Sequence, residues 1–238
     1  MSEGANTPLH RRSLPHRELA RRYRHYFSRS DFRTAAALSG VLFVLSVVAS
    51  FFAIRYATER ASNSVTDIIL SNVPAVDVDG LFIWGTVFLI AFIALLLLAH
   101  PKRVPFTLNC LALFYFIRSG FVSLTHIGPF PLQSENAYDL GHFLSTFLFS
   151  SDLFFSAHTG VPFLLALIFW REKTVRNIFL AWSVYMASVV LLGHYHYSID
   201  VASAFFITYT IYVLGGYLFP KSNALFLHDP SLAEDSRK

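Results

Sequence analysis

The stretch LFIWGTVFLIAFIALLLLA, residues 81–99, contains no charged residue. It is about as long as the roughly 20 residues that an α-helix needs to cross the hydrocarbon core of a bilayer, and the polar sequence HPKR follows it. Hydrophobic residues make up 54% of the 238 residues and charged residues only 14%. Soluble domains carry more charge. The sequence therefore predicts an all-α integral membrane protein.

Other apolar stretches of similar length extend this prediction. We expect six transmembrane helices in one bundle, at residues 35–54, 81–99, 104–127, 153–170, 174–192 and 201–219. The segment LGHFLSTFLF, residues 140–149, is too short to cross and is predicted to be interfacial or re-entrant. The chain is thus divided into a basic N-terminal tail (1–34), a membrane domain (35–219) and a C-terminal tail (220–238).

The N-terminal tail and the cysteine content exclude some classes of protein. The tail lacks the apolar stretch and the cleavage site of a signal peptide. It is expected either to be partly helical and to lie against anionic lipid or to be disordered. Cys110 is the single cysteine, so a disulfide framework and cysteine-ligated zinc or iron–sulfur sites are excluded.

Lysine and arginine are distributed unevenly about the predicted spans. Sixteen of the 19 fall in the two tails and in the loops after the second and fourth spans. The opposite side has Arg55 and Arg60, and Arg118 lies within a span. By the positive-inside rule, both termini are cytoplasmic and the remaining loops face away from the cytosol.

Four ionisable residues are predicted at one depth, near the non-cytoplasmic boundary. His158 lies about 7.5 Å below that boundary, and Arg118 lies about 21 Å along a core roughly 30 Å thick. His196 and Asp200 open the last span on the same side. Each could be structural, since a buried His is often hydrogen-bonded and an Asp can cap a helix. Their common depth favours a functional site, because ionisable groups within membranes usually mark one.

The residue types indicate phosphorus chemistry. His196 and Asp200 are four residues apart, on one helical face, so the carboxylate can accept Nδ1–H and leave Nε2 as a nucleophile. His158 could donate a proton to a leaving oxygen, and Arg118 could bind phosphate oxygens. Two His and one Asp could instead bind a zinc ion, but the positive charge of Arg118 would repel it.

Three motifs resemble the sphingomyelin synthase family, within the type 2 phosphatidic acid phosphatase superfamily. SSDLFFSAHT, residues 150–159, resembles the family pattern C-G-D-x3-S-G-H-T, and HYSIDV, residues 196–201, resembles H-Y-T-x-D-V. YFIRSGFVSLT, residues 115–125, matches Y-x2-R-x6-T. The motifs occur in the family's order, and the six-span layout extends the similarity to residues 35–219.

The resemblance implies that the membrane domain is a lipid phosphotransferase that needs no metal or other cofactor. By analogy, His196 attacks phosphorus and becomes a phosphohistidine, Asp200 orients it, and His158 protonates the departing diacylglycerol and then deprotonates the incoming hydroxyl. Arg118 binds phosphate. The matching positions that are expected to contact substrate are Asp152, Tyr115, His194, Tyr197 and Ser156. The partners are a phospholipid donor and a lipid hydroxyl acceptor, with no nucleic acid.

Departures from the family pattern bear on the substrate. Cys-Gly is replaced by Ser150-Ser151, and the Gly before His158 is Ala157. The K-x6-R-P motif of the superfamily's ordinary phosphatases does not occur, and Val190 stands six residues before His196, where they carry Arg. Fewer fixed cations suit the single charge of a phosphodiester, which favours the synthase branch over the phosphatases.

A choline or ethanolamine head group would suit a carboxylate and aromatic rings. Asp152 is the first candidate for this role, with helix capping as its alternative; Glu135 and Asp139 are weaker ones. A lipid phosphatase or phospholipase C-like hydrolase on the same scaffold is the alternative activity, and a non-catalytic lipid binder or transporter is a third. The short tails favour a bacterial inner membrane, with the site on the periplasmic side, while a lumenal site in a Golgi or plasma-membrane setting stays open.

Overall fold

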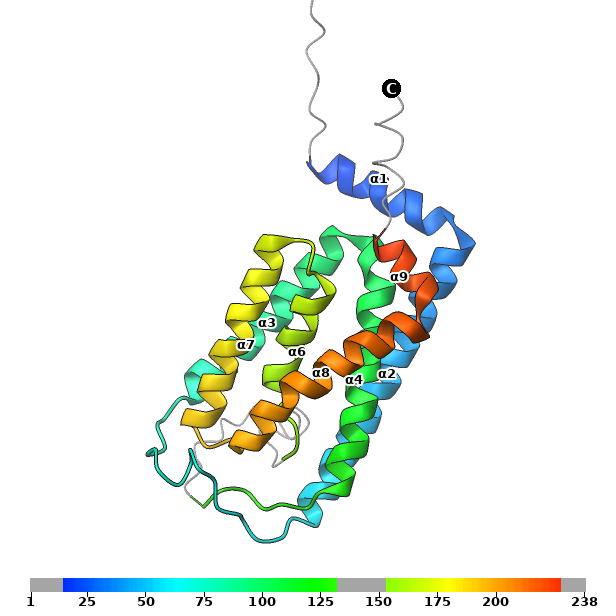
Figure 1. Cartoon of the computed structure of the whole chain (residues 1–238). Coiled ribbons are helices and arrows are strands. Elements are labelled where there is room, and N and C mark those ends of the chain that lie inside the picture. The colour runs from blue at the N-terminus through cyan, green and yellow to red at the C-terminus, as the bar shows by residue number, and fades with distance from the viewer. Residues whose placement is uncertain (1–14, 132–152, 228–238) are drawn as a thin grey trace, which may run out of the picture.

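The fold is an assembly of helices. The computed structural model describes residues 15–131 and 153–227, and these residues contain no strand. The elements are α1 (Pro15–Ser28), α2 (Ser30–Glu59), α3 (Asp79–Ala99), η1 (Pro101–Arg103), α4 (Val104–Leu124), α6 (Ala157–Ile168), α7 (Lys173–Leu192), α8 (Ser198–Leu218) and α9 (Pro220–Leu227) (Figure 1). The prediction of an all-α fold is confirmed for this part of the chain. The segment 140–149 lies outside the described residues.

Five helices are long and apolar enough to cross a membrane: α2, α3, α4 with the preceding η1, α7 and α8. They correspond to five of the six predicted spans, although α4 ends at Leu124 and α8 at Leu218, before the predicted ends at 127 and 219. The remaining predicted span, residues 153–170, is not confirmed as a full crossing. Its helix, α6, has 12 residues and is about 18 Å long at 1.5 Å per residue, which is shorter than a hydrocarbon core of roughly 30 Å. Its start is fixed by Ser156, whose side chain accepts a hydrogen bond from the Thr159 amide, and Phe154 has a positive φ of 113° that no helix continues through.

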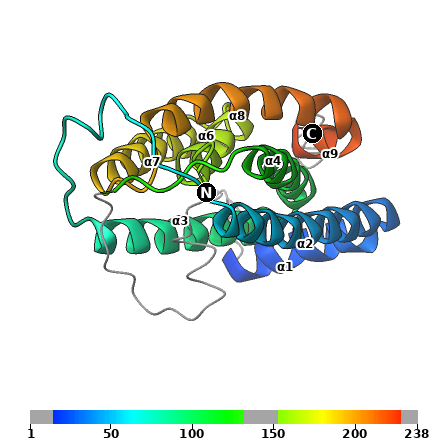
Figure 2. The same ribbon diagram turned by 90° about the horizontal axis from the view of Figure 1, so that it is seen from below.

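The short helix α6 lies inside the bundle. Seen from below, α8 runs along one side and α2 and α3 along the other, with α4, α6 and α7 between them (Figure 2). Leu164, Leu165 and Ala166 of α6 are fully buried. Helices in lipid associate through close packing rather than through a hydrophobic driving force. Accordingly, Gly160 of α6 meets the Phe114 ring of α4 so closely that a Cβ there would lie 2.8 Å from it.

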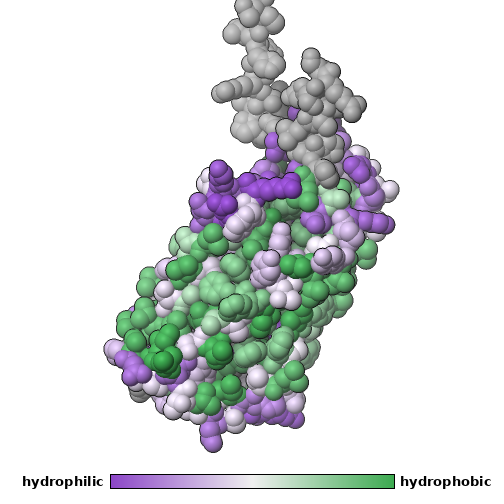
Figure 3. Space-filling view, viewed as in Figure 1, coloured by the Kyte–Doolittle hydropathy of each residue, from purple (hydrophilic) through white to green (hydrophobic). Residues whose placement is uncertain are grey.

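The hydropathy of the surface differs between the middle of the bundle and its two ends. On the face shown in Figure 3, the surface is hydrophobic around the middle of the bundle and hydrophilic towards both ends. With the apolar helices, this pattern indicates an integral membrane protein. One end carries α1, η1 and α9; we call the opposite end the loop end, formed by residues 60–78 and 125–131 (Figure 1).

The two loops of the loop end are joined to each other. The Ser62 amide donates a hydrogen bond to the His126 carbonyl at 2.7 Å, and the Gly128 amide donates to the Asn63 carbonyl at 3.1 Å. A Cβ at Gly128 would lie 2.1 Å from the Ser62 carbonyl oxygen, so only glycine permits this approach. Both loops also hydrogen-bond to the residues at the start of α8.

Candidate active site

His196 and Asp200 form a buried pair at the start of α8. His196 Nδ1 lies 3.2 Å from Asp200 Oδ2, and the two side chains are 3% and 1% exposed. An ionised carboxylate can only accept, so Nδ1 is the donor and Nε2 keeps its lone pair. His196 precedes the N-cap Tyr197, so the two residues do not share a helical face as the spacing predicted. The pairing arises instead because Asp200, in the first turn, reaches back over the helix start and also accepts from the Tyr197 amide at 3.1 Å.

His158 faces this pair from the start of α6. Its ring centroid lies 6.4 Å from that of His196, and the two ring planes are inclined by 52°. The Phe82 ring of α3 lies 4.5 Å from His158 on another side. Nδ1 of His158 has no hydrogen-bond partner among the residues described. A histidine so placed has a nitrogen available to give or take a proton.

Arg118 connects α4 to the segment that leads into α6. Its side chain is 2% exposed, and Nε donates to the Phe155 carbonyl at 3.0 Å. The next residue, Ser156, donates its amide to the Asp200 carbonyl at 3.1 Å. Arg118, the start of α6 and Asp200 are therefore joined in one hydrogen-bonded chain, which places a permanent cation at the segment leading to His158.

The segment HYHYS, residues 194–198, is fixed by the loop before α3. His194, with a φ of 57°, directs its Nε2 to the Val73 carbonyl at 3.1 Å. The Tyr195 hydroxyl donates to Asp79 at the first turn of α3. These contacts hold the two residues that precede His196, which stabilises the tight turn from α7.

The residues that follow His196 are held by both loops of the loop end. The Tyr197 hydroxyl donates to the Gly128 carbonyl at 2.9 Å and accepts from the Val65 amide at 3.2 Å. Asp67 Oδ2 accepts from both the amide and the hydroxyl of Ser198, at 2.7 and 2.8 Å. Asp67 thereby caps the N-terminus of α8 from a distant part of the chain. His196 is fixed on both sides and is left to face His158.

The predicted substrate-contacting residues occupy different surroundings. Tyr197 and Ser156 are buried, and their hydroxyl groups already bind backbone within the protein. His194 has one ring nitrogen on the Val73 carbonyl and the other without a described partner. The Tyr115 ring packs against Phe43 and Phe114. Asp152, Glu135 and Asp139 lie outside the described residues.

Three residues of the site escaped the sequence analysis: Asp67, Asp79 and Phe82. Asp79 and Phe82 are buried on one face of α3, and Asp67 is 8% exposed. The only signal was the presence of two acidic residues in VDVDG, directly before the second span. Asp67 lies 131 residues from its partner Ser198, and no local pattern reports such a contact.

One comparison with known families covers two of the three sequence motifs, those at residues 150–159 and 196–201. Residues 150–217, which include His158, His196 and Asp200 but not Arg118, match the family described as PAP2 superfamily C-terminal. Neither a curated protein nor a solved structure matches the chain. Chemistry of the lipid phosphatase and phosphotransferase type is what this family suggests, acting on phosphate esters of phospholipids. The match over residues 150–217 therefore supports the type 2 phosphatidic acid phosphatase superfamily for this chain.

Proposed function

We propose that the protein moves the phospho-head-group of a glycerophospholipid, of the choline or ethanolamine type, to the hydroxyl of a ceramide-like lipid. The observation that carries this proposal is the pair of facing imidazoles, 6.4 Å apart, one of them fixed by a buried carboxylate. One imidazole is oriented as a nucleophile and the other is available for proton transfer.

In the first step, Nε2 of His196 attacks phosphorus and the bond from phosphorus to the diacylglycerol oxygen breaks. That oxygen takes a proton from His158, and diacylglycerol leaves. The head-group phosphate remains on His196 as a phosphoramidate. Asp200 stabilises the positive charge that develops on the imidazole through the Nδ1 hydrogen bond, which strengthens when the donor is charged.

In the second step, His158, now neutral, takes the proton of the acceptor hydroxyl. The oxygen attacks phosphorus, the bond from phosphorus to Nε2 breaks, and His196 and His158 return to their starting states. Arg118 binds phosphate oxygens during both steps, and the positive end of the α6 dipole favours the same anion. The chemistry needs no metal because histidine and arginine side chains handle the protons and the charge.

The proposed orientation places the site on the non-cytoplasmic side. The basic loops after α3 and α6 lie at the same end as α1 and α9, and Arg103 of the first loop pairs with Glu172 of the second at 2.6 Å. The site lies at the opposite, loop end. By the positive-inside rule both termini are cytoplasmic and the site lies on the other side, which is the periplasmic side of the bacterial inner membrane that we propose as the location.

Transfer and hydrolysis differ in their need for an acceptor. Purified protein in lipid nanodiscs is given phosphatidylcholine labelled in its head group, with and without ceramide. The proposal expects a labelled phosphosphingolipid with ceramide and little water-soluble phosphocholine without it. Equal release of phosphocholine in both reactions would identify a hydrolase and contradict the transferase proposal.

A further inference from the structure

We infer that Asp79, with the rings of Phe82 and Tyr195, binds the positively charged end of the donor's head group. The inference rests on the proposed function and names the part of the site that selects a cationic substrate. It concerns residues of α3 and of the turn before α8.

Asp79 has a buried carboxylate with one oxygen unused. The residue is 3% exposed. One oxygen accepts from the Tyr195 hydroxyl, while Oδ2 has no hydrogen-bond partner among the residues described. Burying a charge is costly unless it is paired, and a neutral phenol does not pair it. An ammonium group from a ligand would supply the missing partner.

Two aromatic rings belong to the surroundings of this carboxylate. Asp79 and Phe82 are three residues apart on α3 and so lie on one helical face. The Phe82 ring centroid lies 4.9 Å from that of Tyr195. Aromatic faces attract cations, and aromatic cages are the recurrent means of binding quaternary ammonium groups. A carboxylate next to two rings therefore fits both choline and ethanolamine.

This group of residues lies next to the proposed phosphorus site. The Phe82 ring lies 4.5 Å from the His158 ring, and Tyr195 directly precedes His196. In choline and ethanolamine head groups the nitrogen is two carbons beyond the phosphate oxygen. The positive end of a head group whose phosphorus lies between the two histidines can therefore reach Phe82 and Asp79.

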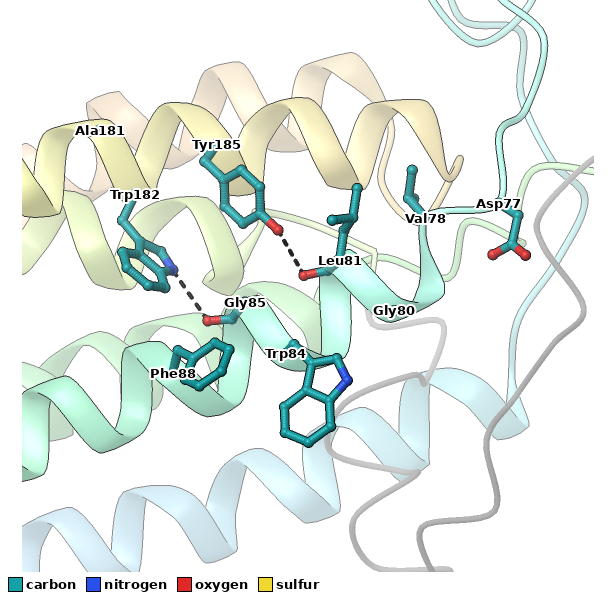
Figure 4. A pocket seen from close by; sticks show the side chains of 10 residues that line it. All are labelled: Asp77, Val78, Gly80, Leu81, Trp84, Gly85, Phe88, Ala181, Trp182 and Tyr185. Carbon is teal, nitrogen blue, oxygen red and sulfur yellow. Dashed lines mark hydrogen bonds between the residues drawn. The ribbon is translucent and has the colours of Figure 1, made fainter.

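The outer face of α3 offers a path for the rest of the lipid. A groove of about 740 Å³ runs between α3 and α7, lined by apolar and aromatic side chains such as Trp84, Phe88 and Tyr185 (Figure 4). One end of the groove reaches Val78 and Gly80, the neighbours of Asp79 in the chain. A lipid whose acyl chain lay in this groove would bring its head group to the start of α3.

Two variants separate the charge of Asp79 from its hydrogen bond. Asp79→Asn removes the charge and keeps an acceptor for Tyr195, whereas Tyr195→Phe removes that hydrogen bond and keeps the charge. Donor consumption is measured with phosphatidylcholine, phosphatidylethanolamine and phosphatidylglycerol, whose head group beyond the phosphate is uncharged. Glu59→Gln, an exposed carboxylate paired with Arg55 near the same end of the bundle, controls for the general surface charge.

We expect Asp79→Asn to lower kcat/KM for the two cationic head groups about tenfold relative to phosphatidylglycerol, the size of a lost charge-assisted contact. Tyr195→Phe and Glu59→Gln should leave that ratio close to the wild-type value. An equal loss with all three donors in Asp79→Asn, or an unchanged ratio, would overturn the inference and leave Asp79 a structural role.

A binding measurement separates this inference from the proposed transfer reaction. Short-chain phosphatidylcholine and phosphatidylglycerol are titrated into the wild type and into Asp79→Asn, with tryptophan fluorescence as the readout, without any acceptor. The inference expects weaker binding of the choline lipid alone in the variant. This result holds even if the enzyme proves to be a hydrolase, and equal binding of both lipids to both proteins would contradict the inference.

Discussion

The two facing histidines are held in opposite ways. His196 lies in a turn whose neighbouring residues are all hydrogen-bonded to distant parts of the chain; these neighbours are His194, Tyr195, Tyr197 and Ser198. His158 lies in the first turn of α6, where the backbone of Ser156 is hydrogen-bonded to Asp200, but Nδ1 of the His158 ring has no described partner. Hydrogen bonds thus fix the position and the tautomer of His196, while His158 keeps one ring nitrogen that does not bond to the described part of the protein.

This difference matches the two roles that we propose. A nucleophile gains from a fixed orientation, because reacting atoms must meet at a defined distance and angle. A general acid and base must exchange its proton twice in each cycle, so it gains from a nitrogen that is not engaged by the protein. The predictions below test whether the two histidines differ in this way.

The largest effect is expected for His196→Ala. Removing a nucleophile should lower kcat/KM at least about 100-fold, with every donor. The assay is head-group transfer in nanodiscs. His100→Ala, at the opposite end of the bundle, is the matched control and should stay near wild-type activity. Retention of transfer activity in His196→Ala would show that His196 is not the nucleophile, and an absence of transfer in the wild type as well would point to a non-catalytic lipid binder or transporter.

His158→Ala should lose about 100-fold with natural donors, because the alkoxide of diacylglycerol needs a proton to leave. The comparison becomes sharper with p-nitrophenyl phosphorylcholine, whose leaving group departs without protonation. There, release of nitrophenol in the first turnover should be much less affected in His158→Ala than in His196→Ala. Equal losses in both variants would remove the distinction between nucleophile and acid.

Gly160→Ala should disturb the packing that holds α6. The added methyl would lie 2.8 Å from the Phe114 ring and 2.9 Å from Thr208 Oγ1, and both residues are buried. Overpacking of this kind costs about 1–3 kcal/mol, which thermal unfolding in detergent can measure. Gly40→Ala in α2, where an added Cβ meets nothing within 4 Å, is the control and should not destabilise the protein.

Asp67→Ala should remove the hydrogen bonds that hold the start of α8, next to His196. Loss of a helix cap costs about 0.5–2 kcal/mol, and the turn that carries His196 should become less well fixed. We expect a lower Tm together with a lower kcat and a nearly unchanged KM. A fall in Tm with wild-type kcat would mean that the loop stabilises the fold without positioning His196.

The smallest effect concerns pH and the same carboxyl group. Burial alone would raise the pKa of Asp67, but hydrogen bonds from the Leu70 amide and from Ser198 outweigh it and lower the pKa below its ordinary value. Its stabilising contribution is therefore complete above the unfolded pKa of about 3.9 and is lost as pH falls through the lower folded value. Thermal unfolding between pH 6 and pH 3 should show a smaller decline in Asp67→Asn than in the wild type.

Much of the fold follows from local sequence. Five spans were predicted because an apolar stretch of membrane length, such as residues 81–99, must form a helix to satisfy its backbone in lipid. The length of α6 was not predicted correctly, because residues Leu153–Phe155 before the helix are as apolar as the helix itself. The helix start depends on the Ser156 cap and on the backbone of Phe154, which hydropathy does not report.

Some residues of the candidate site could likewise be predicted from local sequence, and others could not. His158, His196, Asp200 and Arg118 could be selected because ionisable residues are rare in apolar spans, and the structure places the two imidazole centroids 6.4 Å apart. Asp67 and Asp79 could not be selected, since their hydrogen-bond partners lie more than a hundred residues away in the sequence. Such contacts depend on how the loops fold over the bundle.

The covalent state of His196 tests the central claim most directly. Wild-type protein is incubated with phosphatidylcholine and no acceptor, denatured at alkaline pH, where a phosphohistidine survives, and digested for mass spectrometry. We predict that the peptide containing His196 carries the mass of phosphocholine and that added ceramide before denaturation removes it. Consumption of donor with His196 unmodified would contradict the proposed mechanism.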